Sequence, residues 1–228
     1  GTTPGKCLRV DLIVHLPADR ALTLKTRFGE IQAQDLKADL MLDTGSGKVS
    51  VARHLGSLDI DTGSGDVSIA TAQGKILVDT GSGDVDIIDG HGRINADTGS
   101  GDVRLKGNRG DVRADTGSGE VDIKDFADGS DLDLDTGSGS VGVEGDLAQV
   151  RRLRIDTGSG DIKVITHTAA SLELEADSGS GSVTVDVPGA HVEQRERTHA
   201  QATIGAGAGK AKLDAGSGSI EFRQVPAR

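Results

Sequence analysis

The chain has 228 residues and contains 34 glycines, three phenylalanines and neither tryptophan nor tyrosine, so its core must be built from small aliphatic side chains. Its net charge of −11 argues against nucleic acid or an anionic membrane surface as the partner, because both attract a basic face. The sequence holds no run of about 18 apolar residues, which argues against insertion into a membrane.

Residues 1–24 are predicted to form an N-terminal strand or cap. They begin Gly-Thr-Thr-Pro-Gly, without a basic and apolar leader, so we expect an export signal to have been removed or to precede this sequence. Cys7 is the single cysteine, and we interpret it as a small residue near the first strand and not as a reactive thiol. The stretch Val10 to Leu16 alternates and predicts an opening strand that covers one end of the core.

Residues 25–228 carry a repeat. The first four intervals between its copies are 18 residues each, and the next three are 20, 21 and 21. A fixed period of this size is typical of stacked structural repeats, so we predict one elongated domain. The segment Lys25 to Ile31 is a degenerate copy of the repeat motif, and less exact copies of the motif begin at Asp177 and Asp214. The sequence Asp-Thr-Gly-Ser-Gly begins at Asp43, Asp61, Asp79, Asp97, Asp115, Asp135 and Asp156.

Each repeat has two pairs of aliphatic residues, and the members of a pair are two positions apart. One coil has Ile76 and Val78 before the turn and Val85 and Ile87 after it. Spacing of two predicts two short strands per coil, joined by the Gly-Ser-Gly turn and by a second turn such as residues 70–75. Glycine suits the first turn because it adopts backbone angles closed to other residues. We therefore predict an all-β fold, a parallel β-solenoid of about ten short coils with a period of roughly 18–21 residues.

The regular spacing breaks near the C-terminus. Between Val185 and Asp214 lies a longer gap that contains the polar run from Glu193 to Gln201. It predicts one imperfect coil over residues 186–213, with a loop that leaves the stack. In three later coils the second turn is longer, and its loops begin at Lys124, Glu144 and Ile165. These loops are expected to form a contact surface.

With this organisation, the chain resembles the bacterial adhesin-like family of β-strand repeats, usually described as domains of unknown function. The resemblance rests on the Thr-Gly-Ser-Gly-Asp-Val repeats, the entry segment Val10-Asp11-Leu12-Ile13-Val14-His15-Leu16-Pro17 and the closing pattern Val183-Thr184-Val185-Asp186-Val187-Pro188. It covers nearly everything from Val10 to Phe222. It implies a right-handed parallel β-solenoid in an exported protein of the bacterial cell envelope or exterior, and it supplies no binding residues.

Acidic residues form two columns beside the Gly-Ser-Gly turn. Alternation should turn the motif threonine inward, as a ladder of hydroxyls, and the motif aspartate outward, where it would accept hydrogen bonds from turn amides. The alternative is an acidic ridge that binds Ca²⁺, which prefers carboxylate and carbonyl oxygens. The chain lacks the Gly-Gly-x-Gly-x-Asp repeat of calcium-binding β-rolls, which favours capping and predicts no cofactor. The residues of the ridge would be Asp61, Asp66, Asp79, Asp84, Asp97, Asp102, Asp115 and Glu120.

Three other functions fit the sequence less well. Asp-Thr-Gly-Ser is also the signature of aspartic proteases, which need two facing aspartates that share a proton. Seven copies along one ladder do not fit that arrangement. Ice binding requires exposed threonines, whereas alternation points these inward. The six histidines form no column and no ligand spacing, so neither a zinc site nor a catalytic base is predicted.

The sequence therefore predicts no catalytic residues and no enzyme. It favours a non-catalytic adhesion or interaction module that displays repeated polar ladders to an unknown surface protein or glycan. The alternative is a structural scaffold that self-assembles end to end into filaments.

Overall fold

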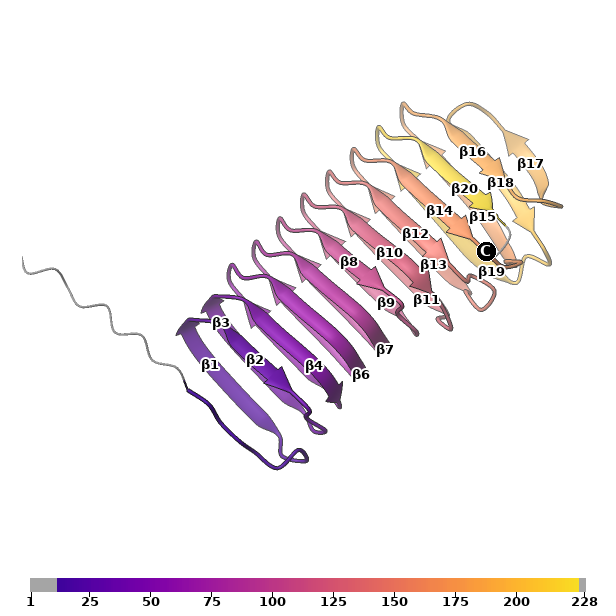
Figure 1. Ribbon diagram of the computed structural model, residues 1–228. Helices are drawn as coiled ribbons and strands as arrows, with labels where there is room; N and C mark the ends of the chain where they lie inside the picture. The colour runs from indigo at the N-terminus through magenta and orange to yellow at the C-terminus, as the bar shows by residue number, and fades with distance from the viewer. Residues whose placement is uncertain (1–11, 226–228) are drawn as a thin grey trace, which may run out of the picture.

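The fold is an elongated stack of strands, seen in a computed structural model that describes residues 12–225. This range contains strands and turns and no helix (Figure 1). Strands of successive coils pair in parallel and in register, as Val67 does with Val85 and Asp79 with Asp97. The all-β parallel solenoid predicted from the 18-residue period is confirmed. Cys7 lies outside the described residues.

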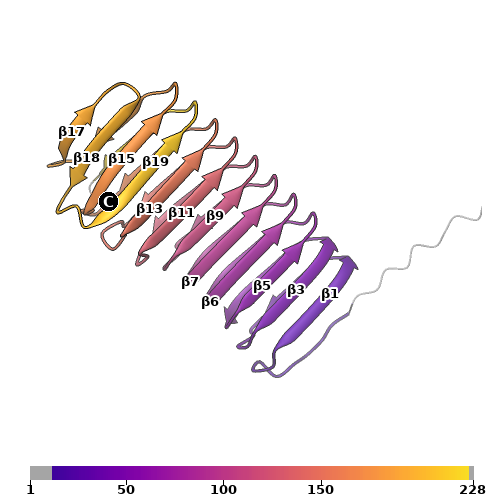
Figure 2. The same cartoon turned by 180° about the vertical axis from the view of Figure 1, so that it is seen from behind.

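One face of the stack, the first face, holds the strands that carry the motif aspartate (Figure 2). Its strands follow one another in parallel pairs from the N-terminal end of the stack. In spatial order they are β1 (Leu22–Phe28), β3 (Leu40–Ser46), β5 (Leu58–Thr62), β6 (Val67–Thr80), β7 (Val85–Thr98), β9 (Val112–Thr116), β11 (Asp131–Thr136), β13 (Arg152–Thr157), β19 (Gly209–Ala215) and β15 (Leu172–Ser178).

The opposite face, the second face, holds the strands that follow the Gly-Ser-Gly turn (Figure 1). The long strands β6 and β7 belong to both faces, because each begins on the second and ends on the first. The other strands of this face, in spatial order, are β2 (Ile31–Gln34), β4 (Val49–Leu55), β8 (Val103–Lys106), β10 (Val121–Phe126), β12 (Val141–Gly145), β14 (Ile162–Thr166), β20 (Ile220–Gln224) and β16 (Val183–Asp186).

The second turn is a short third side of the coil, which the sequence did not predict. In the coil of β6, the chain passes through residues 70–75 without leaving the strand, and it bends at Thr71, whose φ is 58°. Ala72 points into the core and is buried, at 2% exposed. A left-handed backbone at a β-branched residue is costly, so the parallel neighbours on this side must hold it in place.

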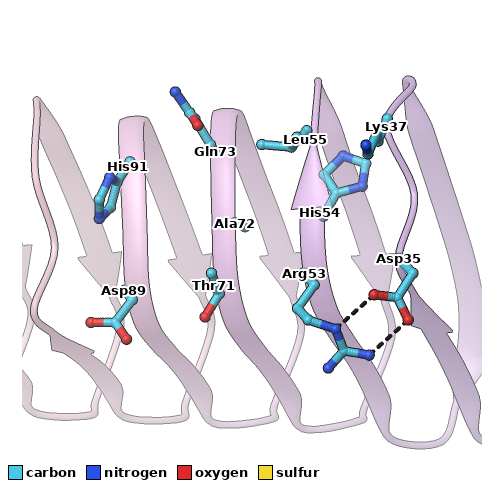
Figure 3. Close-up of a pocket in the computed structure, with 10 residues that line it drawn as sticks. All are labelled: Asp35, Lys37, Arg53, His54, Leu55, Thr71, Ala72, Gln73, Asp89 and His91. Carbon is cyan, nitrogen blue, oxygen red and sulfur yellow. Dashed lines mark hydrogen bonds and ion pairs between the residues drawn. The ribbon is translucent and has the colours of Figure 1, made fainter. Parts of the chain in front are cut away.

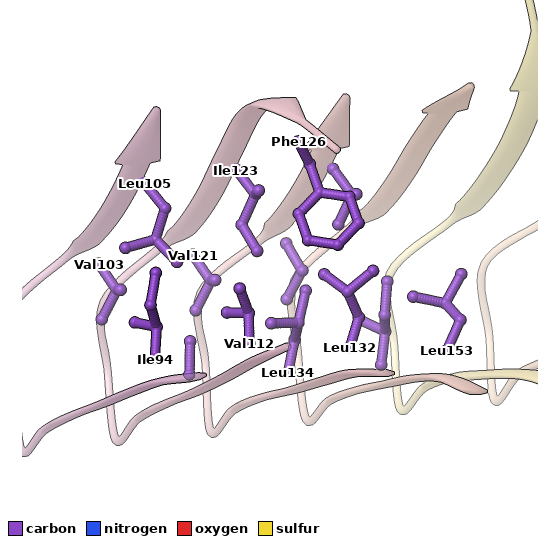
Figure 4. Close-up of a cluster of buried hydrophobic side chains, with 14 of the residues drawn as sticks. Ile94, Val103, Leu105, Val112, Val121, Ile123, Phe126, Leu132, Leu134 and Leu153 are labelled. Carbon is purple, nitrogen blue, oxygen red and sulfur yellow. The ribbon is translucent and has the colours of Figure 1, made fainter. Parts of the chain in front are cut away.

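The core is a column of small aliphatic side chains between the two faces (Figure 4). The four predicted positions Ile76, Val78, Val85 and Ile87 are all 0% exposed. Four such side chains contribute about 6–10 kcal/mol per coil before the opposing chain entropy. Phe126 adds a larger buried ring from the third side, where the loop of that coil lengthens.

The glycines of the motif are required because the turns of successive coils lie in backbone contact. A Cβ on Gly101 would lie 1.9 Å from the carbonyl oxygen of Gly83, and a Cβ on Gly83 would lie 2.0 Å from that of Gly65. None of these three glycines has a left-handed φ. The expectation that this turn needs unusual backbone angles is therefore wrong for these coils, and close approach is the physical reason for glycine.

At the C-terminal end, spatial order departs from chain order. Strands β19 and β20 lie between the coil of β13 and β14 and the coil of β15 and β16. The last coil therefore returns to fill an internal level of the stack. The imperfect coil expected over residues 186–213 is wrong. These residues instead contain an antiparallel pair, β17 (His191–Arg195) and β18 (His199–Ile204), which covers the free edge of β15.

At the N-terminal end, the described part of the predicted opening strand is not paired. Residues 12–17 form no strand, and β1 begins at Leu22, before the expected boundary at residue 25. Leu12 is 79% exposed and Ile13 is 80% exposed. Among residues 12–225, additional strands therefore cover the C-terminal end of the solenoid and not the N-terminal end.

Candidate functional site, an aspartate ladder

A continuous row of aspartates runs along the outside of the first face, and we call it the aspartate ladder. Each member is the in-register partner of the next, and parallel neighbours of this kind lie about 4.8 Å apart. The insertion of β19 keeps the row unbroken. In spatial order the ladder consists of Asp43, Asp61, Asp79, Asp97, Asp115, Asp135, Asp156, Asp214 and Asp177.

Cations lie beside the first member of the ladder and beside most members from Asp115 onward, but not beside the three members between them. Lys25 lies 3.0 Å from Asp43, and Arg154 lies 3.2 Å from Asp156. His199 contacts Asp177. Within residues 12–225, no ion pair joins a cation to the three members that we call the open stretch, Asp61, Asp79 and Asp97.

The open stretch is electrostatically unfavourable. The pKa of Asp61 is raised above its ordinary value by partial burial and, next, by the carboxylates of Asp79 and Asp43. Partial burial followed by Asp115 and Asp79 raises the pKa of Asp97 in the same way. Asp61, Asp79 and Asp97 are all exposed, so their carboxylates remain accessible to a partner. The open stretch thus concentrates negative charge in a row that has no ion-pair partner within residues 12–225.

The second acidic column consists of Asp66, Asp84, Asp102 and Glu120, which follow the Gly-Ser-Gly turn. Its aspartates accept hydrogen bonds from turn amides, the role that was expected of the motif aspartates. The amide of Asp102 donates to Asp84 Oδ1 at 2.9 Å, and the amide of Glu120 donates to Asp102 Oδ1 at 2.8 Å. The Asp102 amide and then the Arg104 guanidinium lower the pKa of Asp84. Asp66 accepts from the Asp84 amide in the same manner. The prediction that the motif aspartates accept turn amides is therefore wrong for the open stretch.

The predicted cation ridge is divided between two faces. Asp61, Asp79, Asp97 and Asp115 lie on the first face. The residues of the second column come directly before strands of the second face, at Asp66, Asp84, Asp102 and Glu120. Among residues 12–225, no group of three His, Cys, Asp or Glu side chains is arranged to hold a metal ion. The described structure therefore brings no Ca²⁺ site together from these residues.

The motif threonines point inward and link successive turns, as predicted. Thr98 Oγ1 donates to the carbonyl of Gly83 at 2.9 Å and accepts from the amide of Gly101 at 3.1 Å. Thr98 is 1% exposed, so this hydroxyl is a structural group of the corner and not a displayed one. Thr44 and Thr62, near the N-terminal end, are equally buried, but their hydroxyls have no hydrogen-bond partner.

The third side carries a shallow groove that sequence reasoning missed (Figure 3). Its volume is about 340 Å³, and it runs between the row Asp35, Arg53, Thr71, Asp89 and the row Lys37, Leu55, Gln73, His91. Arg53 and Asp35 close one end through two hydrogen bonds of 2.6 and 2.7 Å. His54 beneath it is 1% exposed, and its Nδ1 atom has no partner. A single inward histidine per chain forms no column, so no repeat signal could reveal it.

The longer loops are anchored in the core. Leu147 and Val150, in the loop that follows β12, are 0% and 3% exposed, and Ala170 in the next loop is 3% exposed. These residues fill the third side as its outline widens. The lengthening of these loops is therefore explained by packing, which weakens their interpretation as a contact surface.

The protease signature is not placed in a catalytic arrangement. The motif aspartates lie on parallel strands in register, so neighbouring carboxylates point the same way. In the described part of the chain, no second copy of the motif faces the first from an opposing strand. This geometry differs from the facing pair that an aspartic protease requires.

Comparison with known proteins agrees with the repeat architecture. The family model of the Toastrack DUF4097 domain matches residues 7–141 and again residues 112–223. No curated protein and no solved structure gives a significant match to this chain. Residues 12–225 contain no helix long and apolar enough to cross a membrane. Together, the two matched ranges cover nearly the whole solenoid, and the chain belongs to the Toastrack DUF4097 family.

Proposed function

We propose that this protein is a non-catalytic interaction module of the bacterial cell envelope or exterior, and that the aspartate ladder is its contact surface. The partner would be a surface protein that presents basic side chains at a spacing close to that of the coils. The observation that carries the proposal is the open stretch. Neighbouring ladder carboxylates raise the pKa of Asp61 and Asp97, and the charges of Lys25 and Arg113 offset this only in part. Within residues 12–225, no cation forms an ion pair with Asp61, Asp79 or Asp97, and no amide donates a hydrogen bond to their carboxylates.

Rigidity supports this role. The backbone of each ladder strand is paired on both sides, from β3 to β15. A partner that binds several carboxylates at once therefore meets them already ordered, which reduces the entropy lost on binding. Neighbouring carboxylates also reinforce the negative potential that attracts a basic surface.

A protein partner is favoured over a glycan. The chain has no tryptophan and no tyrosine, so it lacks the aromatic platforms whose amphipathic rings suit sugar faces. Adhesion, in this proposal, is attachment to another protein through charge complementarity.

The test is a capture experiment on solubilised bacterial envelope material, at low and at physiological salt. The ladder variant carries Asp61→Asn, Asp79→Asn and Asp97→Asn together. The matched off-ladder variant removes the same charge elsewhere through Glu30→Gln, Asp89→Asn and Asp125→Asn. Proteins captured by the wild type and the off-ladder variant, and lost with the ladder variant, would support the proposal. Equal capture by all three would contradict it.

The alternative of a filament-forming scaffold is less well supported. At the C-terminal end, β18 pairs antiparallel with β15 and β17 forms the outer edge, so the parallel stack of the first face does not continue there as it could at the N-terminal end. Two ends of different structure do not present the matching parallel edges that end-to-end growth of the solenoid needs, so a pair of chains that meet at their N-terminal ends is favoured over a filament. Light scattering across a concentration series tests this, because growth beyond a dimer would restore the filament alternative.

A further inference from the structure

We propose that the N-terminal end of the solenoid is a strand-accepting edge, and that it accepts residues Leu12–Leu16 of the same chain. In the accepted state these residues pair in parallel with β2, with Leu12 opposite Ile31 and Val14 opposite Ala33. The segment thereby adds a half-coil below the first coil. This inference is independent of the partner that the aspartate ladder binds.

The edge itself is free in the structure. Strand β1 pairs with β3, and β2 pairs with β4, and within residues 12–225 neither has a partner on its other side. At the opposite end, β18 pairs with the edge of β15, and the amide of Val183 in β16 donates to the carbonyl of Arg197 at 2.9 Å. Free strand edges attract further strands, so the uncovered end is the one suited to receive one.

The segment carries apolar side chains that nothing covers. Leu12 is 79% exposed and Val14 is 52% exposed, although both are aliphatic. On the edge, Leu22, Leu24, Ala33 and Leu36 are only partly buried against the core. The segment and the edge are joined by only a few residues. Contact between them is favourable because it buries the apolar surface of both.

The register follows from a hydrogen bond already present. The amide of Lys37 donates to the carbonyl of Ala18 at 2.6 Å, which places residue 18 beside residue 37 on the third side. The same offset carried back along the chain sets Val14 beside Ala33 and Leu12 beside Ile31. Figure 1 shows residues 12–17 crossing the N-terminal end in the same direction as β2, as parallel pairing requires.

The pattern of the segment matches a strand that occupies the same position in another coil. Leu12, Val14 and Leu16 alternate before Pro17, as Val183, Val185 and Val187 alternate before Pro188. Val183 and Val185 belong to β16, where they lie in register with Ile220 and Phe222 on the second face. Leu12 and Val14 are therefore the inward residues of the proposed strand, and Ile13 and His15 are its outward residues.

The experiment is hydrogen exchange, followed by mass spectrometry, on the full chain at low micromolar concentration. We expect amides of residues 12–16 to exchange roughly tenfold or more slowly than in the isolated peptide of the same sequence. Val14→Asp should remove this protection and speed exchange in residues 31–34, because it places a carboxylate against the core. Ile13→Asp is the matched control, since it adds the same charge on the outward side and should leave protection intact.

Two results would overturn the proposal. One is wild-type exchange in residues 12–16 as fast as in the peptide, with Val14→Asp and Ile13→Asp indistinguishable. The other is protection that appears only as the mass doubles with concentration, because the strand would then come from a second copy. Slow exchange at monomeric mass that Val14→Asp alone abolishes would support it.

Discussion

Asp214 lies in register beside Asp156, although the five strands from β14 to β18 intervene between them in the chain. The last coil of the sequence is thus an internal coil of the stack. It is flanked by β13 on one side and by β15 on the other. The terminal position in space belongs to the coil of β15 and to the antiparallel pair that covers it.

This insertion predicts that Leu213 behaves as a residue of the middle of the solenoid. Leu213 and Leu134 are both 0% exposed, and each is flanked by strands on both sides. Leu213→Ala should therefore cost about 2–5 kcal/mol in urea unfolding, close to the cost of Leu134→Ala. Leu24→Ala, in the open β1, should cost much less. A cost for Leu213→Ala as small as that of Leu24→Ala would place the last coil at a fraying end.

The corner threonines offer a comparison between satisfied and unsatisfied hydroxyls. Thr98→Val leaves the amide of Gly101 and the carbonyl of Gly83 without this partner, so it should cost roughly 1–3 kcal/mol. Thr62→Val removes a buried hydroxyl that has no partner and should be neutral or slightly stabilising. Thermal unfolding of the two variants measures the difference. Equal losses would show that the hydrogen bonds of Thr98 do not matter.

The contact between successive turns predicts a sharp difference between neighbouring positions. Gly101→Ala should destabilise the fold by several kcal/mol or prevent folding, because its Cβ would lie 1.9 Å from the oxygen of Gly83. Ser100→Ala in the same turn is exposed and should change stability by no more than about 0.5 kcal/mol. Circular dichroism and urea unfolding distinguish the two. A tolerated Gly101→Ala would mean that the turns stack less closely than described.

The raised pKa values of the open stretch predict a pH-dependent gain from neutral substitutions. Because the folded pKa of Asp61 and Asp97 lies above the unfolded value, their contribution is fully favourable below the unfolded pKa and is lost as pH rises through the folded pKa. Asp97→Asn should therefore stabilise the protein at pH 7. Solvent screening limits the gain to several tenths of a kcal/mol, at most about 1 kcal/mol.

The gain should shrink toward zero near pH 4, where the wild-type carboxylates take up protons. Added salt at pH 7 should raise the stability of the wild type more than that of the variant, since it screens the same repulsion. Urea unfolding at the two pH values measures both effects. A gain from Asp97→Asn that is unchanged at pH 4 would rule out charge repulsion as its cause.

Much of the core could be predicted because alternation within each coil is a strict physical constraint. Ile76, Val78, Val85 and Ile87 had to point inward once the strands were recognised, and the motif threonines followed from the same alternation. The position of the last coil within the stack, between the coil of β13 and the coil of β15, could not be predicted. Strands β15 and β19 present compatible edges to their neighbours, so the local pattern does not distinguish their order.

The candidate site was only partly predictable for a related reason. Asp84 and Asp97 belong to similar acidic columns, but Asp84 accepts an amide of the next coil whereas Asp97 accepts none within the described residues. That distinction depends on the position of each carboxylate relative to the stacked turns, and the aligned sequence repeats do not contain this information. The bend at Thr71 was hidden because six residues are too few to show a period.

The most direct test of the aspartate ladder as a contact surface is the affinity of a short oligolysine peptide, measured by fluorescence anisotropy at low salt. The wild type and the off-ladder variant should bind with dissociation constants within about twofold of each other, whereas the ladder variant should bind at least roughly tenfold more weakly. Equal weakening by the two variants would mean that only net charge matters, and it would contradict the ladder as a specific surface.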